Sequence, residues 1–218
     1  MLIDFRELFP KYNIQPKGIL HIGANVGEEA PVYLELGITK QVWIEANPGI
    51  FEILKKNLES NPEAFALNWC ISDIQEDVTF HVSNNGSQSS SILELGTHKE
   101  MHPNVHYTAD LKMTAVTIDQ VYMAHSYSNP YSILVPILND LDFLNIDLQG
   151  AELKALKGMG TRLNKFKWVY LEVNFDHVYE NCPLLPEIDE YLEGYGFRRV
   201  ELKWASQNLT WGDALYIK

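Results

Sequence analysis

The stretch that decides the fold is Lys17-Gly18-Ile19-Leu20-His21-Ile22-Gly23-Ala24-Asn25-Val26-Gly27. Its first part, 17–22, is a short apolar run that stops at Gly23, which is typical of a buried strand. Helical spacing follows over 28–36, with Pro31 in the first turn, where proline is tolerated, and Gly37 placed to end the helix. A glycine turn between a strand and a helix lies where open α/β sheets bind their ligands.

The same alternation of strand and helix continues along the chain. Strands are predicted at 41–45 and 64–71, with a helix between them over 47–58. The alternation returns with strands at 143–147 and 168–173, helices at 151–157 and 184–195, and a final strand pair at 197–202 and 214–217. This pattern predicts a doubly wound α/β fold, in which helices cover both faces of a parallel sheet. No linker divides the chain, so we expect a single domain over 1–218, with 1–16 as an N-terminal extension.

Composition limits the classes of partner. The 218 residues carry a formal net charge of −12, which disfavours a nucleic-acid substrate because an acidic surface repels phosphates. We find no secretory leader and no apolar run long enough to span a bilayer, so we expect no membrane association and a cytoplasmic location. The two cysteines, Cys70 and Cys182, do not have the spacing of a metal site.

The spacing within the glycine turn distinguishes between ligands. A dinucleotide site uses Gly-x-Gly-x-x-Gly, whereas Asn25 and Glu28 stand here at the second and third glycine positions. Glu28 would repel a pyrophosphate, so a Gly-x-x-x-Gly turn suits a ligand without phosphates. Glu45 ends the second predicted strand and can accept hydrogen bonds from both hydroxyls of a ribose.

Two further polar positions follow strands. Ser72 and Asp73 come after the third predicted strand and can contact the amino group of an adenine, or form an ordinary Ser-Asp turn. Asp147 ends the apolar run 143–146, where burying a carboxylate is costly unless it has a purpose. Its alternative role is an acidic cap on the helix that begins near residue 151.

Taken in order, several segments resemble the FkbM family of class I S-adenosylmethionine-dependent methyltransferases. These segments are 21–27 (HIGANVG), 44–48 (IEANP), 71–73 (ISD), 89–91 (SSS), 116–119 (VTID), 145–152 (NIDLQGAE) and 170–173 (YLEV). The resemblance implies a Rossmann-like seven-stranded sheet, mostly parallel with an antiparallel last strand. It also implies S-adenosyl-L-methionine as cofactor and methylation of a hydroxyl on a sugar or another small natural product.

The resemblance assigns roles to residues. Gly23 to Gly27 would face the methionine end of the cofactor, Glu45 the ribose, and Ser72 or Asp73 the adenine. The expected cofactor-binding residues are His21, Gly23, Ala24, Asn25, Gly27, Glu45, Ala46, Ser72, Asp73 and Asp147. Two positions depart from the family pattern: His21 stands where an acidic residue is usual, and Gln149 replaces the usual glutamate of the 145–152 segment.

Methylation of a hydroxyl requires a group that removes its proton. The candidates are Asp147, Glu172 and His177, and the histidine has the most suitable intrinsic pKa, although a lone loop histidine is more often a bystander. Asp147, Glu172 and Asn174 are also hard oxygen ligands, but nothing in the sequence demands a metal and none is expected.

The acceptor is expected to be a small molecule or a saccharide. Segments 83–104 and 123–141 are the predicted acceptor-side loops, although solvation explains their polar composition equally well. A homo-oligomer is possible. Two alternatives remain: an NAD-dependent oxidoreductase, which Asn25 opposes, and a cofactor-binding module without catalysis.

Overall fold

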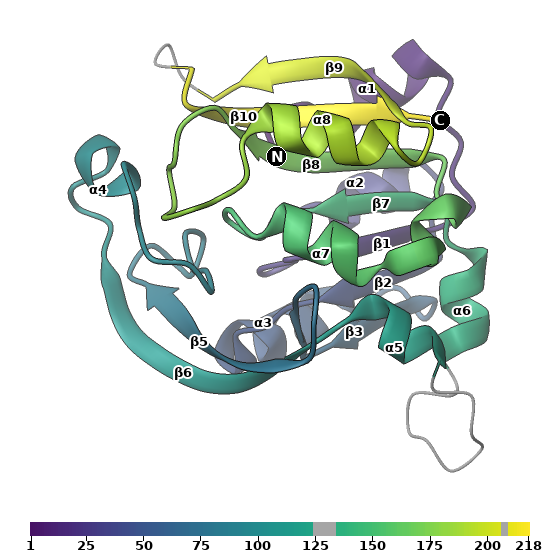
Figure 1. The fold of residues 1–218 in the computed structure, drawn as a ribbon. Helices are drawn as coiled ribbons and strands as arrows, with labels where there is room; N and C mark the ends of the chain where they lie inside the picture. The colour runs from purple at the N-terminus through teal and green to yellow at the C-terminus, as the bar shows by residue number, and fades with distance from the viewer. Residues whose placement is uncertain (124–133, 206–208) are drawn as a thin grey trace.

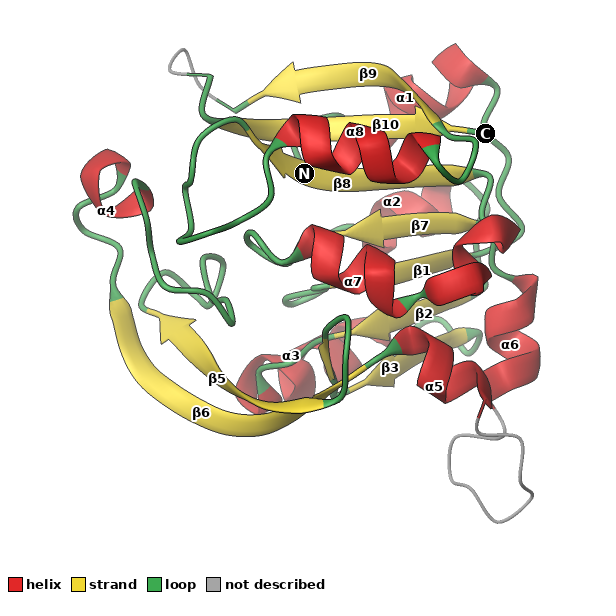
Figure 2. Cartoon of the chain, viewed as in Figure 1, coloured by secondary structure: helices red, strands yellow, loops and turns green. Residues whose placement is uncertain are grey.

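The computed structural model describes residues 1–123, 134–205 and 209–218, and its centre is a sheet of seven strands (Figures 1 and 2). The strands are β1 (Ile19–Ile22), β2 (Gln41–Ile44), β3 (Ala64–Leu67), β7 (Phe143–Ile146), β8 (Trp168–Asn174), β9 (Arg198–Trp204) and β10 (Trp211–Ile217). Their order is β3-β2-β1-β7-β8-β10-β9. Strand β10 runs antiparallel to β8 and β9, and the other strand pairs of this sheet are parallel. The predicted sheet is therefore confirmed.

Helices cover both faces because each strand sends alternate side chains to opposite sides. Leu20 and Ile22 of β1 join one core with α7 (Glu152–Gly158), α8 (Leu185–Glu193) and the 3-10 helix η1 (Gly160–Lys165). Ile19 joins the other core with α2 (Ala30–Glu35) and α3 (Pro48–Leu58). The apolar run of β1 is buried throughout because both of its faces are covered.

The N-terminal residues form a helix that completes the second core. Helix α1 (Phe5–Tyr12) begins at the N-cap Asp4, whose side chain accepts a hydrogen bond from the backbone of Arg6. Phe5 packs within 5.7 Å, centroid to centroid, of the rings of Tyr33, Phe143 and Tyr170. The predicted extension is thus packed onto the sheet, and the residues before α1 reach its carboxyl-end edge.

The predicted strand over 64–71 is wrong as a single element. β3 ends at Leu67, and Cys70–Ile71 form β4 in a second sheet of order β4-β6-β5. That sheet contains β5 (Glu76–Ser83) and the long β6 (Tyr107–Val116). The side-chain amide of Asn68 donates to the backbone oxygens of Glu45 and Ala46, just after β2. Because a side chain and not a neighbouring strand bonds to these carbonyls, the backbone leaves the main sheet after Leu67.

The described parts of the two predicted acceptor-side loops lie at different ends of the molecule. Segment 83–104, with the short helix α4 (His98–Met101), lies at the carboxyl-end edge of the main sheet (Figure 1). Of segment 123–141, residues 124–133 lie outside the described part, and α6 (Leu134–Asp140), which follows α5 (Ile118–Met123), leads into the opposite end of β7. Within the described residues, no helix is long and apolar enough to cross a bilayer.

Candidate active site

The glycine turn lies against the end of β7. Gly23 has φ +81°, and a Cβ added to it would lie 1.7 Å from the backbone oxygen of Asp147. Asn25 and Gly27 also have positive φ, so the chain coils tightly after β1. Only glycine suits position 23, because both its conformation and the close approach of β7 exclude a side chain.

Glu45 holds this turn from the neighbouring strand. Its carboxylate accepts hydrogen bonds from the backbone nitrogens of Asn25, at 2.9 Å, and Asn47, at 2.7 Å. Burial raises the pKa of Glu45 in spite of these bonds. Each carboxylate oxygen has two acceptor sites, so the side chain can still accept two hydroxyl donors from a ligand.

A row of buried polar and aromatic side chains crosses the sheet beneath the site. Trp43, His21, Asn145 and Tyr170 are direct cross-strand neighbours on β2, β1, β7 and β8. Asn145 donates to the hydroxyl of Tyr33 at 2.8 Å, and that hydroxyl lies 3.3 Å from Nδ1 of His21. Burial lowers the pKa of His21 to about 3, so this histidine is neutral.

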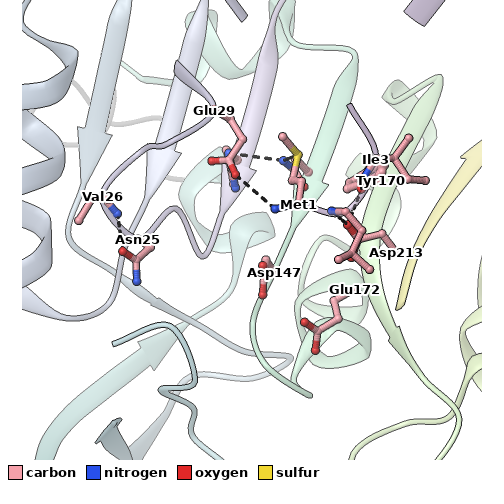
Figure 3. Close-up of polar contacts among 12 residues, drawn as sticks. Met1, Ile3, Asn25, Val26, Glu29, Asp147, Tyr170, Glu172 and Asp213 are labelled. Carbon is pink, nitrogen blue, oxygen red and sulfur yellow. Dashed lines mark hydrogen bonds and ion pairs between the residues drawn. The ribbon is translucent and has the colours of Figure 1, made fainter. Parts of the chain in front are cut away.

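A second row lies two residues further toward the carboxyl ends of the strands, on the same face. It consists of Glu45, Gly23, Asp147 and Glu172, and continues to Asp213, which is paired directly with Glu172 across β10 and β8. Tyr170, in the first row, donates its hydroxyl to Asp213. Figure 3 shows Asp147, Glu172 and Asp213 near one another, with Met1 between Glu29 and Asp213.

Burial and mutual repulsion govern the charge of this second row. Burial is the largest cause that raises the pKa of Asp147, to about 6, and the neighbouring Asp213 contributes. The pKa of Glu172 lies well above its ordinary value because the side chain is buried near Asp147, Glu152 and Asp213. Burial also raises the pKa of Asp213. These groups hold protons more readily than exposed carboxylates do.

Gln149 joins two of these carboxylates. Its amide nitrogen donates to Asp147 at 2.6 Å and to Glu172 at 2.9 Å, while its amide oxygen accepts from the hydroxyl of Tyr179 at 2.6 Å. A glutamate at this position would supply no donor and would add a third negative charge. The departure from the family pattern therefore gives an uncharged bridge between the two candidate bases.

A cavity of about 420 Å³ lies over these residues. The predicted residues that line it are His21, Gly23, Ala24, Asn25, Glu45, Ala46, Asp147 and Glu172. The wall also includes part of the serine-rich segment, with Ser87, Ser89, Ser90 and Ser91 all buried. Solvation therefore does not explain this serine-rich composition. Its hydroxyls bond to one another, as at Ser87 and Ser90, and Ser87 also accepts from the amide of Asn47 at 3.1 Å.

Four predicted residues lie outside the cavity lining. Gly27 packs behind the turn, where an added Cβ would lie 2.7 Å from Leu54. Ser72 is buried and donates to Asp73, which is paired with Lys154 at 3.2 Å. His177 is exposed, and its Nδ1 donates to the backbone oxygen of Cys182 at 3.1 Å. The structure therefore does not bring His177 near Asp147 and Glu172.

Several lining residues were missed from the sequence. Trp69, Cys70 and Ile71 line the cavity beside Glu45, one to three positions before the predicted Ser72. The break at Asn68, a polar residue within an apolar run, is the signal that could have placed them. Glu29, Asp213, Tyr179 and His98 also line the cavity, and so do Met1 and Leu2. No periodicity or spacing marks these residues, because they reach the site only through tertiary packing.

A protein-family model identifies the family to which the chain belongs. Residues 21–199 match the model of the methyltransferase FkbM domain, and the chain belongs to this family of S-adenosylmethionine-dependent methyltransferases. No curated protein matches the chain.

Similar solved structures share the fold at low sequence identity. One is an S-adenosylmethionine-dependent methyltransferase from Aquifex aeolicus (TM-score 0.51, 10% identity, 99% of this chain and 90% of that one). Another is a ribosomal protein L11 methylase from Lactobacillus delbrueckii subsp. bulgaricus (TM-score 0.52, 9% identity, 98% and 76%). A third is magnesium protoporphyrin IX methyltransferase from Synechocystis PCC 6803 with bound S-adenosylmethionine (TM-score 0.50, 9% identity, 98% and 75%).

Proposed function

We propose that this chain transfers a methyl group from S-adenosylmethionine to a hydroxyl of a sugar or another small natural product. The observation that carries the proposal is the row of carboxylates beside the glycine turn. Asp147 and Glu172 lie on adjacent strands, line one cavity and share the Gln149 bridge. Family membership favours methyl transfer over hydride transfer with NAD, in agreement with Asn25 and Glu28 in place of two glycines.

The residues present suit the cofactor. Gly23 leaves room for close contact with the backbone, and Glu45 keeps acceptor sites for two ribose hydroxyls. Trp69 and Ile71 offer apolar surface to an adenine at the neighbouring strand end. When bound, S-adenosylmethionine supplies an activated methyl group on a cationic sulfur. The carboxylates of the second row stabilise a positive charge in this cavity.

Asp147 and Glu172 are the candidates for the proton acceptor. Both have raised pKa values, which makes each a stronger base than an exposed carboxylate once it is ionised. The amide of Gln149 donates to one carboxylate oxygen of Asp147 and to one of Glu172. The second oxygen of each carboxylate does not bond to Gln149. His177 has no comparable position, so we assign it no part in proton transfer.

The test has two stages. Calorimetry with S-adenosylhomocysteine and with NAD first identifies the cofactor, and we expect binding of S-adenosylhomocysteine alone. Incubation with methyl-labelled S-adenosylmethionine and a panel of hydroxylated sugars and alcohols then detects transfer, which we expect Asp147→Asn or Glu172→Gln to lower at least about 100-fold. NAD binding would contradict the proposal. Cofactor binding without transfer to any acceptor would favour the module without catalysis.

A further inference from the structure

One part of the cavity is not required by the cofactor. Glu45, the glycine turn and Asp147 directly follow β2, β1 and β7, and the cavity continues across β8 and β10. There Glu172 faces Asp213 directly across the strand pair, and the next pair on the same face is Asn174 with Trp211. Adjacent strands are about 4.8 Å apart, so Asp213 lies two strand spacings beyond Asp147. Three of these residues, Glu172, Asp213 and Trp211, line the cavity and form the patch where an acceptor would lie.

The patch is acidic and has no side-chain cation. Within the described residues, Asp147, Glu172 and Asp213 make no ion pair, and no lysine or arginine lines the cavity. The two stretches outside the described part, 124–133 and 206–208, contain no lysine or arginine. A cation is supplied instead by the N-terminal ammonium of Met1, which lies 3.7 Å from the carboxylate of Glu29 and also acts on Asp147 and Asp213 (Figure 3).

Two buried side chains near the cavity have polar atoms without a hydrogen-bond partner in the described structure. The amide of Asn174 is buried, and neither its oxygen nor its nitrogen forms a hydrogen bond. His98 lines the cavity and is 6% exposed, and its Nδ1 is also without a partner. Unsatisfied groups of this kind cost stability, and a ligand that bonds to them removes that cost.

We propose that this patch binds an acceptor that carries a protonated amine in addition to the methylated hydroxyl, and that it rejects phosphorylated acceptors. The carboxylates of Glu172 and Asp213 would pair with the ammonium group, and the ring of Trp211 offers a face to the same cation. A phosphate would meet the carboxylates of Asp147, Glu172 and Asp213, and the N-terminal ammonium near them is already paired with Glu29, so its binding is unfavourable. This inference rests on the proposed function, because it names the charge class of that function's acceptor.

The experiment uses three probes with one carbon skeleton: serinol, glycerol and glycerol 3-phosphate. Each is titrated into the full chain saturated with S-adenosylhomocysteine, and binding is followed by the NMR signal of the Trp211 indole, assigned with Trp211→Phe. We expect the Kd for serinol to be at least tenfold lower than for glycerol, and no saturation with glycerol 3-phosphate. Equal affinity for serinol and glycerol, or binding of glycerol 3-phosphate, would overturn the inference.

Substitutions in the patch test whether its carboxylates cause the preference for serinol over glycerol. Asp213→Asn and Glu172→Gln, on different strands, should each reduce the preference for serinol to less than threefold, whereas the exposed control Glu180→Gln should keep it. A full preference in both folded patch variants would also overturn the inference. Failure to bind S-adenosylhomocysteine in the first step would contradict the proposed function, whereas its binding without charge preference contradicts this inference alone.

Discussion

At the scale of single residues, Glu45 has two tasks, because it ties down the glycine turn and faces the cavity. In Glu45→Ala the backbone nitrogens of Asn25 and Asn47 lose their hydrogen-bond acceptor. The hydroxyls of a bound ribose would lose the same carboxylate acceptor. Hydrogen bonds to charged groups contribute about 1.5–3 kcal/mol, so we expect the Kd for S-adenosylhomocysteine to rise about 10- to 100-fold. Calorimetry measures it, with the exposed Glu52→Ala as control. Unchanged affinity would remove Glu45 from the cofactor site.

Gln149 sets the charge of the two candidate bases. In Gln149→Glu a third carboxylate would face Asp147 and Glu172, with Glu152 and Asp213 nearby, so the pKa values of the group should rise. Ionised carboxylates favour the cationic S-adenosylmethionine over neutral S-adenosylhomocysteine. We therefore expect the ratio of the two affinities to increase with pH, and its midpoint to move up by about one pH unit in the variant.

Calorimetry with both compounds between pH 5.5 and 9 tests this expectation without an acceptor. Gln149→Leu is the matched control, because it removes the bridge and adds no charge. A midpoint that is the same in Gln149→Glu and in the parent chain would show that the bridge does not control the ionisation of Asp147 and Glu172.

At the scale of elements, the strand and helix alternation predicted the central sheet because β1, β2, β7 and β8 are short apolar runs ended by polar residues or glycine. The strand break after Leu67 depends on the side-chain amide of Asn68, which bonds to the backbone just after β2. The local sequence pattern does not predict such a contact with a distant strand. The same limit applies to the residues that line the cavity. Glu45 and Asp147 follow apolar runs, so the sequence predicts their position at the edge of the sheet, whereas Asp213 lies within a strand that passes the cavity from the opposite direction.

The serine-rich segment joins the second sheet to the carboxyl-end edge of the main sheet. The Ser87 hydroxyl accepts from Asn47, the N-cap of α3, and bonds to Ser90 at 2.7 Å, while the amide of Asn25 donates to the backbone oxygen of Gly86. Ser87→Ala should destabilise this junction by about 1–2 kcal/mol. Hydrogen exchange should then be about 5- to 30-fold faster over 85–91 than in the exposed control Ser60→Ala. Equal exchange in both would show that the junction is held by other contacts.

At the scale of the whole molecule, a chain of net charge −12 buries several carboxylates in one cavity, so its stability depends on pH. The folded-state pKa is raised for Asp147, to about 6, and for Glu152, to about 7, and also for Glu172 and Asp213. A raised carboxyl pKa means that the unfolded chain releases the proton first. The contribution of these four groups to the free energy of unfolding is therefore largest at about pH 4 and below. It is lost as the pH rises through 6 to 7.

Carboxylates with lowered pKa values, such as Asp73 and Glu201, act in the opposite direction, but their contribution is lost only below about pH 4. His21, whose pKa burial lowers to about 3, and His98, whose pKa burial also lowers, likewise oppose the raised carboxyl pKa values, because the unfolded chain takes up their protons below about pH 6.5. The four buried carboxylates outweigh these two histidines between pH 5.5 and 8. Urea unfolding of the chain without cofactor should give a free energy about 1–3 kcal/mol higher at pH 5.5 than at pH 8, after the opposing contribution of the two histidines. Glu172→Gln should reduce this difference, because a neutral amide cannot ionise and also relieves Asp147. A pH dependence that is the same in Glu172→Gln and in the parent chain would mean that this carboxylate is ionised at little cost. The electrostatic basis for binding a cationic cofactor and a cationic acceptor would then be lost.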